Sequence, residues 1–403
     1  MSIDLQASLK HHFGFDQFRP GQEQTIRQLL KGDSSLAIFP TGSGKSLCYQ
    51  VSALHLPHLT LVVSPLLALM KDQLEFLARQ GVSAARIDST LTAEESQGVM
   101  AKARSGQLKI LMVSVERFKN ERFRLFISSV AVLMLVVDEA HCISEWGHNF
   151  RPDYLKLPVY RQELKIPLVL LLTATATEKV KTDMAAKFAI APQHIVQTGF
   201  YRANLDLTVL PISAADKDRR LVELIRPQSG PGIVYVTLQK SAEQVAEFLR
   251  NNQINAQAYH AGFDDEKRQQ VQAYFMAGSI QVVVATIAFG MGIDKADIRF
   301  VVHYDLPKSI ESYSQEIGRA GRDGLPANCT ILANLDGINT VENFVFGDTP
   351  ELSGIEYVLN IIREECQNGH WELQLSGLAN ASNIRQLPLK TKNRRCLSYG
   401  ATR

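Results

Sequence analysis

A glycine-rich loop between an expected strand and an expected helix is the feature that most constrains the fold of this chain. The apolar residues 36–39 precede the loop as a strand, and residues 46–50 can open a helix after it. Glycines let several backbone N–H groups of such a loop converge, and the helix N-terminus adds partial positive charge at the same point. This arrangement binds phosphate groups. The loop consists of Thr41, Gly42, Ser43, Gly44, Lys45 and Ser46.

Lys45 and Ser46 give the loop the chemistry of a nucleotide site. Lys45 can reach the β- and γ-phosphates, and the Ser46 hydroxyl can ligate Mg²⁺. The strict pattern G-x-x-x-x-G-K-S/T is not met, because Phe39 stands at its first glycine. Taken alone, the loop is therefore also compatible with an ordinary glycine-rich turn between a strand and a helix.

A pair of carboxylates favours the nucleotide site. Residues 132–137 form a continuous apolar run, as in the middle strand of a parallel sheet, and Asp138 and Glu139 follow at its carboxyl end. Ligand sites of open α/β sheets gather at these strand ends. Asp138 can hold a hydrated Mg²⁺, while Glu139 can orient and deprotonate an attacking water.

Apolar runs and helix-compatible segments alternate along the chain, which predicts an α/β fold built from right-handed βαβ units around parallel sheets. We expect two such domains, joined near residues 200–211. The expected strands are 36–39, 61–63, 110–113, 132–137 and 168–172 in the first domain and 233–236, 282–285 and 300–303 in the second, where 241–250 and 264–276 are expected helices.

Composition limits the partners and the cellular compartment. The 43 basic and 41 acidic residues nearly cancel, so binding of nucleic acid must come from a local groove. No apolar run reaches the length of a membrane span, and Asp4 and Lys10 occupy the place of a signal-peptide core, so we expect a cytoplasmic protein. The five cysteines form no C-x-x-C pair, and we expect reduced thiols and no zinc.

Further motifs identify a family. Thr173-Ala174-Thr175 follows the expected strand 168–172, and residues 315–324 read QEIGRAGRDG. In this order with the two motifs above, they resemble a superfamily 2 helicase. Three segments resemble the RecQ DNA helicases specifically: GFDQFRPGQ at 14–22, AHCISEWGHNFRP at 140–152 and AFGMGIDK at 288–295. The likeness covers about residues 13–326.

The resemblance implies two tandem RecA-like (P-loop) parallel-sheet domains with a short helical C-terminal extension. We expect the domains at residues 1–205 and 206–345. The remaining 346–403 would form an incomplete C-terminal region in which 373–389 could begin a winged helix. RecQ proteins usually hold zinc there through four cysteines, whereas this chain offers Cys366 and Cys396, so we expect that module to be absent or replaced.

The resemblance also assigns the ATP site. Phe15 would stack on adenine, Arg19 would support the site, and the Gln22 amide would read the adenine edge. Arg319 and Arg322 match arginines that reach across the interdomain cleft to the γ-phosphate, which would tie hydrolysis to closure of the cleft. For Phe13 and Phe18 we prefer a role in the core.

The loop after His141 matches the aromatic-rich loop of RecQ helicases. Trp146 and Phe150 would stack on bases, and Arg151 would contact phosphate or stack. Val115 stands where relatives commonly have proline, near expected backbone contacts at 114–117. Contacts to the DNA backbone are further expected from Ser64, Lys71 and Thr286, and coupling roles, or hydrogen bonds within the core, from His141, Thr173 and Thr175.

Three functions remain open from the sequence. The first is an ATP- and Mg²⁺-dependent DNA helicase that moves 3′ to 5′ on single-stranded or tailed duplex DNA. The second is an RNA-directed helicase with the same phosphate chemistry. The third is a truncated DNA-binding ATPase that cannot unwind a duplex, because its C-terminal region is incomplete.

Overall fold

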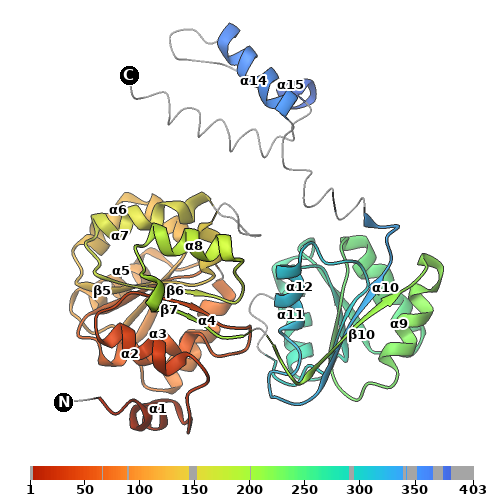
Figure 1. Ribbon diagram of the computed structural model, residues 1–403, viewed down its shortest axis with the longest axis horizontal. Coiled ribbons are helices and arrows are strands. Elements are labelled where there is room, and N and C mark those ends of the chain that lie inside the picture. Colours follow the sequence, from red (N-terminus) through yellow and green to blue (C-terminus); the bar gives the residue numbers. More distant parts are fainter. Residues whose placement is uncertain are drawn as a thin grey trace.

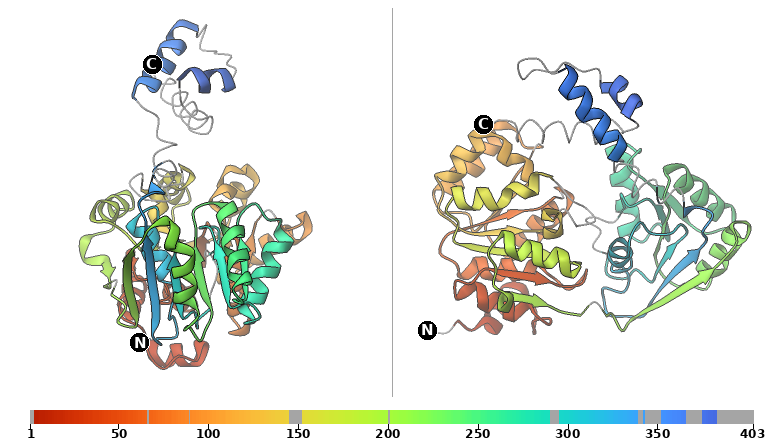
Figure 2. Two further views of the ribbon diagram at one scale, coloured as in Figure 1. Left: turned by 90° about the vertical axis from the view of Figure 1, so that its right-hand side faces the viewer. Right: turned by 45° about the horizontal axis from the view of Figure 1, so that its top comes forward.

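The computed structural model describes residues 3–65, 67–88, 90–144, 152–199, 201–289, 295–338, 342, 352–365 and 375–382. These residues form two parallel sheets, each in a lobe of its own, and the lobes lie side by side (Figures 1 and 2). Both sheets are covered by helices on their two faces. The fold class expected from the sequence, tandem α/β domains followed by C-terminal helices, is confirmed.

The first sheet has seven strands in the order β3-β4-β2-β5-β6-β1-β7. Its strands are β1 (Ser35–Ile38), β2 (Leu59–Val63), β3 (Ala84–Ile87), β4 (Ile110–Val113), β5 (Val132–Val137), β6 (Leu168–Thr173) and β7 (Ile195–Gln197). Its helices are α1 (Leu5–Phe13), α2 (Gln22–Leu30), α3 (Ser46–His55), α4 (Leu67–Arg79), α5 (Ala93–Arg104), α6 (Glu121–Ser128), α7 (Leu157–Glu163) and α8 (Glu178–Lys187). Helices α1 to α4 pack on one face and α5 to α8 on the other.

The second sheet has six strands in the order β10-β11-β9-β12-β13-β8. Its strands are β8 (Leu205–Pro211), β9 (Gly232–Tyr235), β10 (Ala256–Tyr259), β11 (Val282–Ala285), β12 (Phe300–His303) and β13 (Ala327–Ala333). Helices α9 (Lys217–Ile225) and α10 (Gln239–Asn251) cover one face, while α11 (Asp265–Met276) and α12 (Ile310–Ile317) cover the other.

The junction between the domains is shorter than predicted. Residues 205–211, which the sequence places in the connection, form β8, an edge strand paired in parallel with β13 along its whole length. Asp206 and Thr208 interrupt its apolar residues, so β8 lacks the continuous apolar run that marks a buried strand, and Leu207 and Val209 are exposed. Strands β3, β7, β10 and β13 were likewise not predicted.

Two C-terminal helices lie above the two lobes in Figure 1. They are α14 (Leu352–Glu365) and α15 (Leu375–Ser382). Val358 and Leu378 are the buried residues between them, and Ile355 and Ile362 pack against this pair at helical spacing. Cys366, Cys396 and most of the segment expected to begin a winged helix lie outside the described residues.

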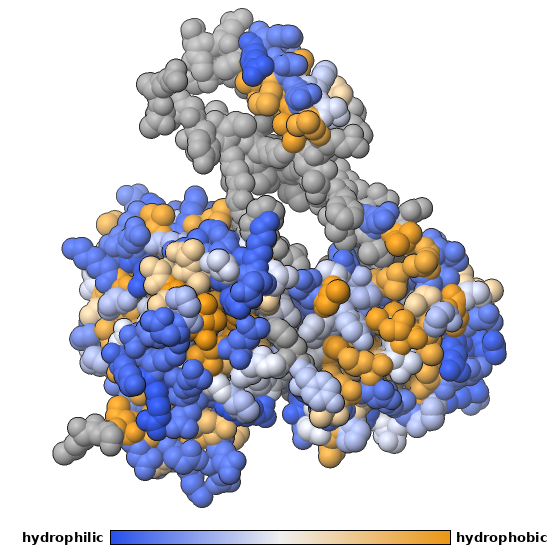
Figure 3. Space-filling view, in the orientation of Figure 1, coloured by the Kyte–Doolittle hydropathy of each residue, from blue (hydrophilic) through white to orange (hydrophobic). Residues whose placement is uncertain are grey.

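The surface of the two lobes differs in character. Over the first domain, the face shown in Figure 3 is mostly hydrophilic, whereas more apolar residues gather over the second. Among the residues that the structure describes, no helix combines the length and the apolar character that crossing a lipid bilayer requires.

Gly232 shows how tightly the second sheet is packed. A Cβ at this position in β9 would lie 2.2 Å from the Phe300 ring of the neighbouring strand β12. We expect Gly232→Ala to lower the free energy of unfolding by about 1–3 kcal/mol, as overpacked cores do. Gly98→Ala is the matched control, because the same methyl group at Gly98 in α5 meets open space. Equal denaturation midpoints for the two variants would contradict this.

Candidate active site

The phosphate loop joins β1 to α3 with two glycines in the left-handed region. Gly42 has φ of 82° and Gly44 has φ of 74°, values that strain any other residue. The Lys45 Nζ donates to the carbonyl oxygens of Phe39 and Pro40 at 3.2 and 3.4 Å. Burial lowers the pKa of Lys45, and the nearby Glu139 and Asp138 partly oppose this. The structure therefore brings Lys45 and both acids together.

Asp138 and Glu139 follow β5 at the carboxyl end of the sheet. The backbone N–H of Asp138 donates to the Val63 carbonyl at 2.9 Å, and its carboxylate accepts from the N–H of Glu139 at 3.0 Å. The Ser64 hydroxyl also donates to this carboxylate, at 3.3 Å. Burial raises the pKa of both acids, Glu139 raises that of Asp138 further, and Lys45 lowers both. Burial makes both carboxylates costly to ionise at this point. A bound cation would stabilise their negative charge, so the pair is suited to hold one.

His141 connects Glu139 to the segment after β6. It is buried in a short 3₁₀-helix, and its Nδ1 lies 3.4 Å from Glu139 Oε2 and 3.0 Å from the Thr173 hydroxyl. Because Thr173 gives its own proton to the Thr175 carbonyl at 3.0 Å, the imidazole Nδ1 acts as the donor to Thr173. The structure thus brings His141, Thr173 and Thr175 together beside Glu139.

Arg319 and Arg322 come from the second domain and face the phosphate loop. The positive charge of Arg319 lowers the pKa of Glu139, and that of Arg322 lowers the pKa of Lys45. Arg322 Cγ lies 3.1 Å from the point that a Cβ on Gly42 would occupy. A Cβ on Gly318 would lie 2.7 Å from the Thr41 side chain. Glycines at both places therefore permit the two domains to touch at the loop.

The segment before α2 lies beside the phosphate loop. The Gln22 Nε2 donates to the carbonyls of Ser43 and Gly44 at 2.9 and 3.0 Å, and its Oε1 accepts from the Arg19 N–H at 2.8 Å. The Arg19 guanidinium donates to the Gly42 carbonyl. To read an adenine edge, the Gln22 amide must exchange these loop contacts for the base. Phe15 is 47% exposed and is thus accessible for stacking.

The remaining aromatic residues of this segment belong to the core. Phe13 is buried and stacks on Phe76 with a ring-centroid distance of 6.1 Å, and Phe18 packs against the same apolar cluster. The role preferred for them from the sequence is confirmed.

The residues predicted to contact DNA lie in different environments. Lys71 is exposed on α4, whereas Thr286 is buried directly after β11. Ser64 is buried too, with its hydroxyl on Asp138. Val115 opens a 3₁₀-helix and is buried. Trp146, Phe150 and Arg151 lie outside the described residues.

The sequence did not reveal Arg202, which joins the two domains. Its Nη2 donates to the carbonyls of Ala320 and Gly321 at 3.0 and 2.6 Å, and its Nη1 to the Thr41 carbonyl at 3.5 Å. Asn204 adds bonds to Gly321 and Leu325 at 2.8 and 2.9 Å. An arginine and an asparagine in the short connection before β8 were the available signal.

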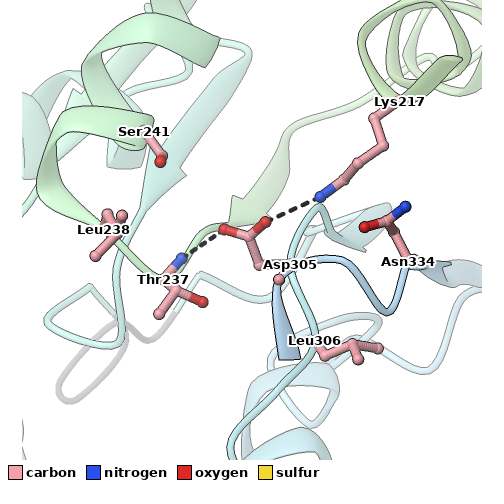
Figure 4. A pocket seen from close by; sticks show the side chains of 8 residues that line it. Lys217, Thr237, Leu238, Ser241, Asp305, Leu306 and Asn334 are labelled. Carbon is pink, nitrogen blue, oxygen red and sulfur yellow. Dashed lines mark hydrogen bonds and ion pairs between the residues drawn. The ribbon is translucent and has the colours of Figure 1, made fainter. Parts of the chain in front are cut away.

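A separate pocket of about 110 Å³ lies in the second domain (Figure 4). Asp305 lies within it, and its carboxylate accepts from Lys217 Nζ and from the Thr237 N–H, both at 2.9 Å. The pocket contains none of the predicted site residues. The Asp305 carboxylate is thus paired with Lys217 within this pocket.

Comparison with known proteins identifies the family of the chain. The profile of the DEAD/DEAH box helicase family matches residues 19–183, and that of the helicase conserved C-terminal domain matches residues 216–324. The chain is 45% identical over 320 residues to the ATP-dependent DNA helicase RecQ of Pasteurella multocida, a match that covers 79% of this chain and 50% of that protein. It belongs to the RecQ-like superfamily 2 helicases.

This RecQ-like chain is also 42% identical over 330 residues to the ATP-dependent DNA helicase RecQ of Bacillus subtilis, covering 81% of this chain and 56% of that protein. The chain thus spans about half the length of the curated relatives it matches.

Two solved structures share the fold of this chain. S. cerevisiae Dbp5 bound to RNA and ADP BeF3 has a TM-score of 0.65 at 18% identity, covering 90% of this chain and 97% of that chain. The DUF1998 helicase MrfA bound to DNA has a TM-score of 0.68 at 19% identity, covering 87% and 51%. At these identities, the likeness extends to the fold: two tandem RecA-like domains.

Proposed function

We propose that this protein is an ATP-dependent DNA helicase that couples ATP hydrolysis to 3′–5′ movement along single-stranded DNA. The observation that carries the proposal is the meeting of Lys45, Asp138 and Glu139 of one domain with Arg319 and Arg322 of the other. A site divided between two domains links a change at the nucleotide to a change in domain position. The names of the RecQ relatives support DNA as the nucleic acid.

The residues fit Mg²⁺ as the metal. Mg²⁺ prefers oxygen ligands and is usually held by one or two carboxylates together with substrate phosphates. In the described part of the chain, no group of three or more His, Cys, Asp or Glu side chains could hold a metal ion by itself. We assign the Ser46 hydroxyl and the Asp138 carboxylate as its protein ligands. When bound, Mg²⁺ would neutralise charge on the phosphates.

The protein residues would share the hydrolysis as follows. The N–H groups of the loop and Lys45 bind the phosphates, and Glu139 orients the attacking water and takes its proton. His141 lies beside the Glu139 carboxylate, with Nδ1 3.4 Å from Oε2. Arg319 and Arg322 stabilise the charge that develops on the γ-phosphate. Phe15, Arg19 and Gln22 would hold the adenine.

The DNA would contact residues of both domains. Trp146 and Phe150 would stack on bases, Arg151 and Lys71 would contact phosphates, and Thr286 would hold the backbone in the second domain. We also propose domain boundaries after residues 205 and 345, no bound zinc and a cytoplasmic location.

A comparison of nucleic acids tests the proposal. We expect single-stranded DNA to raise the ATPase rate severalfold, and an RNA of matching length and sequence to raise it less, because the aromatic loop resembles that of DNA helicases. Equal or stronger stimulation by RNA would favour an RNA-directed helicase instead. Steady-state phosphate release against oligonucleotide concentration gives the answer.

Strand separation needs its own assay. We expect ATP-dependent unwinding of a duplex with a 3′ tail and none of the same duplex with a 5′ tail. DNA-stimulated hydrolysis without unwinding of either duplex would identify a DNA-binding ATPase that lacks the helicase step.

A further inference from the structure

The hydroxyl of Tyr235 joins two segments of the second domain. Tyr235 ends β9 in the middle of the sheet and is buried. Its Oη accepts a hydrogen bond from Arg319 Nε at 2.9 Å and donates one to the Phe289 carbonyl at 3.1 Å. A phenol has one proton and free lone pairs, so it can make both bonds at once.

The second bond leads toward Thr286. The Phe289 N–H donates to the Thr286 carbonyl at 3.0 Å, which closes the turn that follows β11. The Thr286 N–H in turn donates to the Tyr259 carbonyl at 3.2 Å. A change in the position of Tyr235 therefore reaches the Thr286 turn through the Phe289 backbone.

The first bond leads to the nucleotide. Arg319 is 8% exposed, and its charge acts on Glu139 of the other domain. The Tyr235 ring stacks on His303 with a centroid distance of 5.4 Å, and His303 Nε2 lies 2.7 Å from Glu316 Oε2. Glu316 accepts the Arg319 N–H at its carbonyl, at 3.3 Å. Tyr235 is thus held against the turn that carries Arg319 by its ring as well as its hydroxyl.

The hydroxyl keeps its proton under assay conditions. Burial raises the pKa of Tyr235 to about 12, although Arg319 opposes the shift. The bond to Phe289 therefore stays a donor bond at neutral pH.

We propose that Tyr235 is a positioning residue that couples Arg319 at the nucleotide to Thr286 at the DNA, so that nucleotide binding changes the affinity for DNA. The inference rests on the proposed function, which places ATP at Arg319 and DNA at Thr286. His141, Thr173 and Thr175 form a comparable chain of hydrogen bonds in the first domain. Each domain would then carry its own connection between the ATP site and the rest of the protein.

Tyr235→Phe tests this proposal, because it removes the hydroxyl and leaves the ring on His303. The measured quantity is the ratio of Kd values for a labelled single-stranded oligonucleotide without and with a nonhydrolysable ATP analogue, from fluorescence anisotropy. This ratio is the coupling between the two ligands, and couplings of this kind are typically about 5–150-fold. We expect a ratio of that order in the unmodified protein and below about twofold in Tyr235→Phe, with each ligand still bound alone.

Tyr304→Phe is the matched control. Its hydroxyl donates to Asp218 at 2.8 Å, and the residue packs against the apolar cluster on the opposite face of the same sheet. We expect this variant to keep the ratio of the unmodified protein, and both variants to keep its melting temperature within a few degrees.

Two results separate the inference from the function on which it rests. In the first, DNA stimulates the unmodified ATPase, but Tyr235→Phe keeps the full ratio of Kd values, or Tyr235→Phe and Tyr304→Phe lose it equally. The coupling role of Tyr235 is then wrong and the helicase proposal stands. In the second, DNA does not stimulate the unmodified ATPase, and both the coupling role and the helicase proposal are wrong.

Discussion

Replacing Glu139 with glutamine is expected to lower kcat for ATP hydrolysis by about 10²–10⁴-fold, the usual contribution of a general base. Glutamine has nearly the same shape as glutamate but cannot take a proton from water. Because the proposed role of Glu139 is to act on the attacking water and not on the phosphates, we expect ATP to bind with little change. Single-turnover hydrolysis and the Kd of a fluorescent ATP analogue separate the two effects.

The surroundings of Glu139 explain why it can serve as a base at all. Burial raises the pKa of its carboxyl, which alone would favour the protonated form, while Lys45 and Arg319 lower it. The two cations thus help to keep the carboxylate ionised. Glu139 itself adopts φ of 49°, a left-handed backbone conformation at the point where the chain leaves β5.

Glu94→Gln is the control for this experiment. Glu94 is exposed in the first turn of α5 and takes no part in the site, so the same change in charge should leave kcat unaltered. A Glu139→Gln protein that turns over ATP within about threefold of the unmodified rate would rule out Glu139 as the base, since a general base contributes far more.

The strands that the sequence predicts correctly are those with a continuous apolar run, whether or not a motif follows them. Strands β1, β5 and β6 are fully or largely buried, and each ends at residues whose chemistry is visible in the sequence. The edge strand β8 was not predicted because polar residues interrupt its apolar residues and much of it is exposed. Its assignment as a strand depends on pairing with β13. Pairing partners far along the chain leave no local pattern.

The same reason limits prediction of the site. Lys45, Asp138 and Glu139 each belong to a local motif, and the structure brings them together as the motifs suggest. The roles of Tyr235 and Arg202 depend on contacts with residues far along the chain. Tyr235 contacts Arg319, 84 positions away, and Arg202 contacts Ala320, 118 positions away. A tyrosine at the end of an apolar strand reads as a core residue, and the structure shows that its ring is one while its hydroxyl has two polar partners.

Replacing Arg319 with alanine is expected to lower kcat by about 10³–10⁵-fold, the range for an arginine that stabilises phosphoryl transfer. The guanidinium already faces Glu139, although it belongs to the other domain. Its contribution would fall mainly on the transition state, because the charge on the γ-phosphate oxygens increases as the bond breaks. We therefore expect a loss in kcat with a small change in the Kd for ATP.

Arg319→Lys distinguishes geometry from charge. Arginine can donate to Tyr235 from Nε and still present its other N–H groups to phosphate. Lysine retains the positive charge but lacks this planar set of donors, so we expect it to restore little activity. Arg219→Ala is the surface control: Arg219 is exposed on α9 and pairs with Asp216 and Glu223, an arrangement that contributes little in solvent.

Stability must be followed beside the rate, since Arg319→Ala removes a buried partner of Tyr235 and should cost about 1–3 kcal/mol. If Arg319→Ala remains folded at the assay temperature and keeps kcat within about tenfold, it does not stabilise the transferred phosphoryl group. Hydrolysis would then be completed within the first domain, and the contact of the second domain with the phosphate loop would serve to hold the two lobes together. A large loss in kcat with ATP still bound means instead that hydrolysis requires both lobes, which is the condition for ATP turnover to drive movement along DNA.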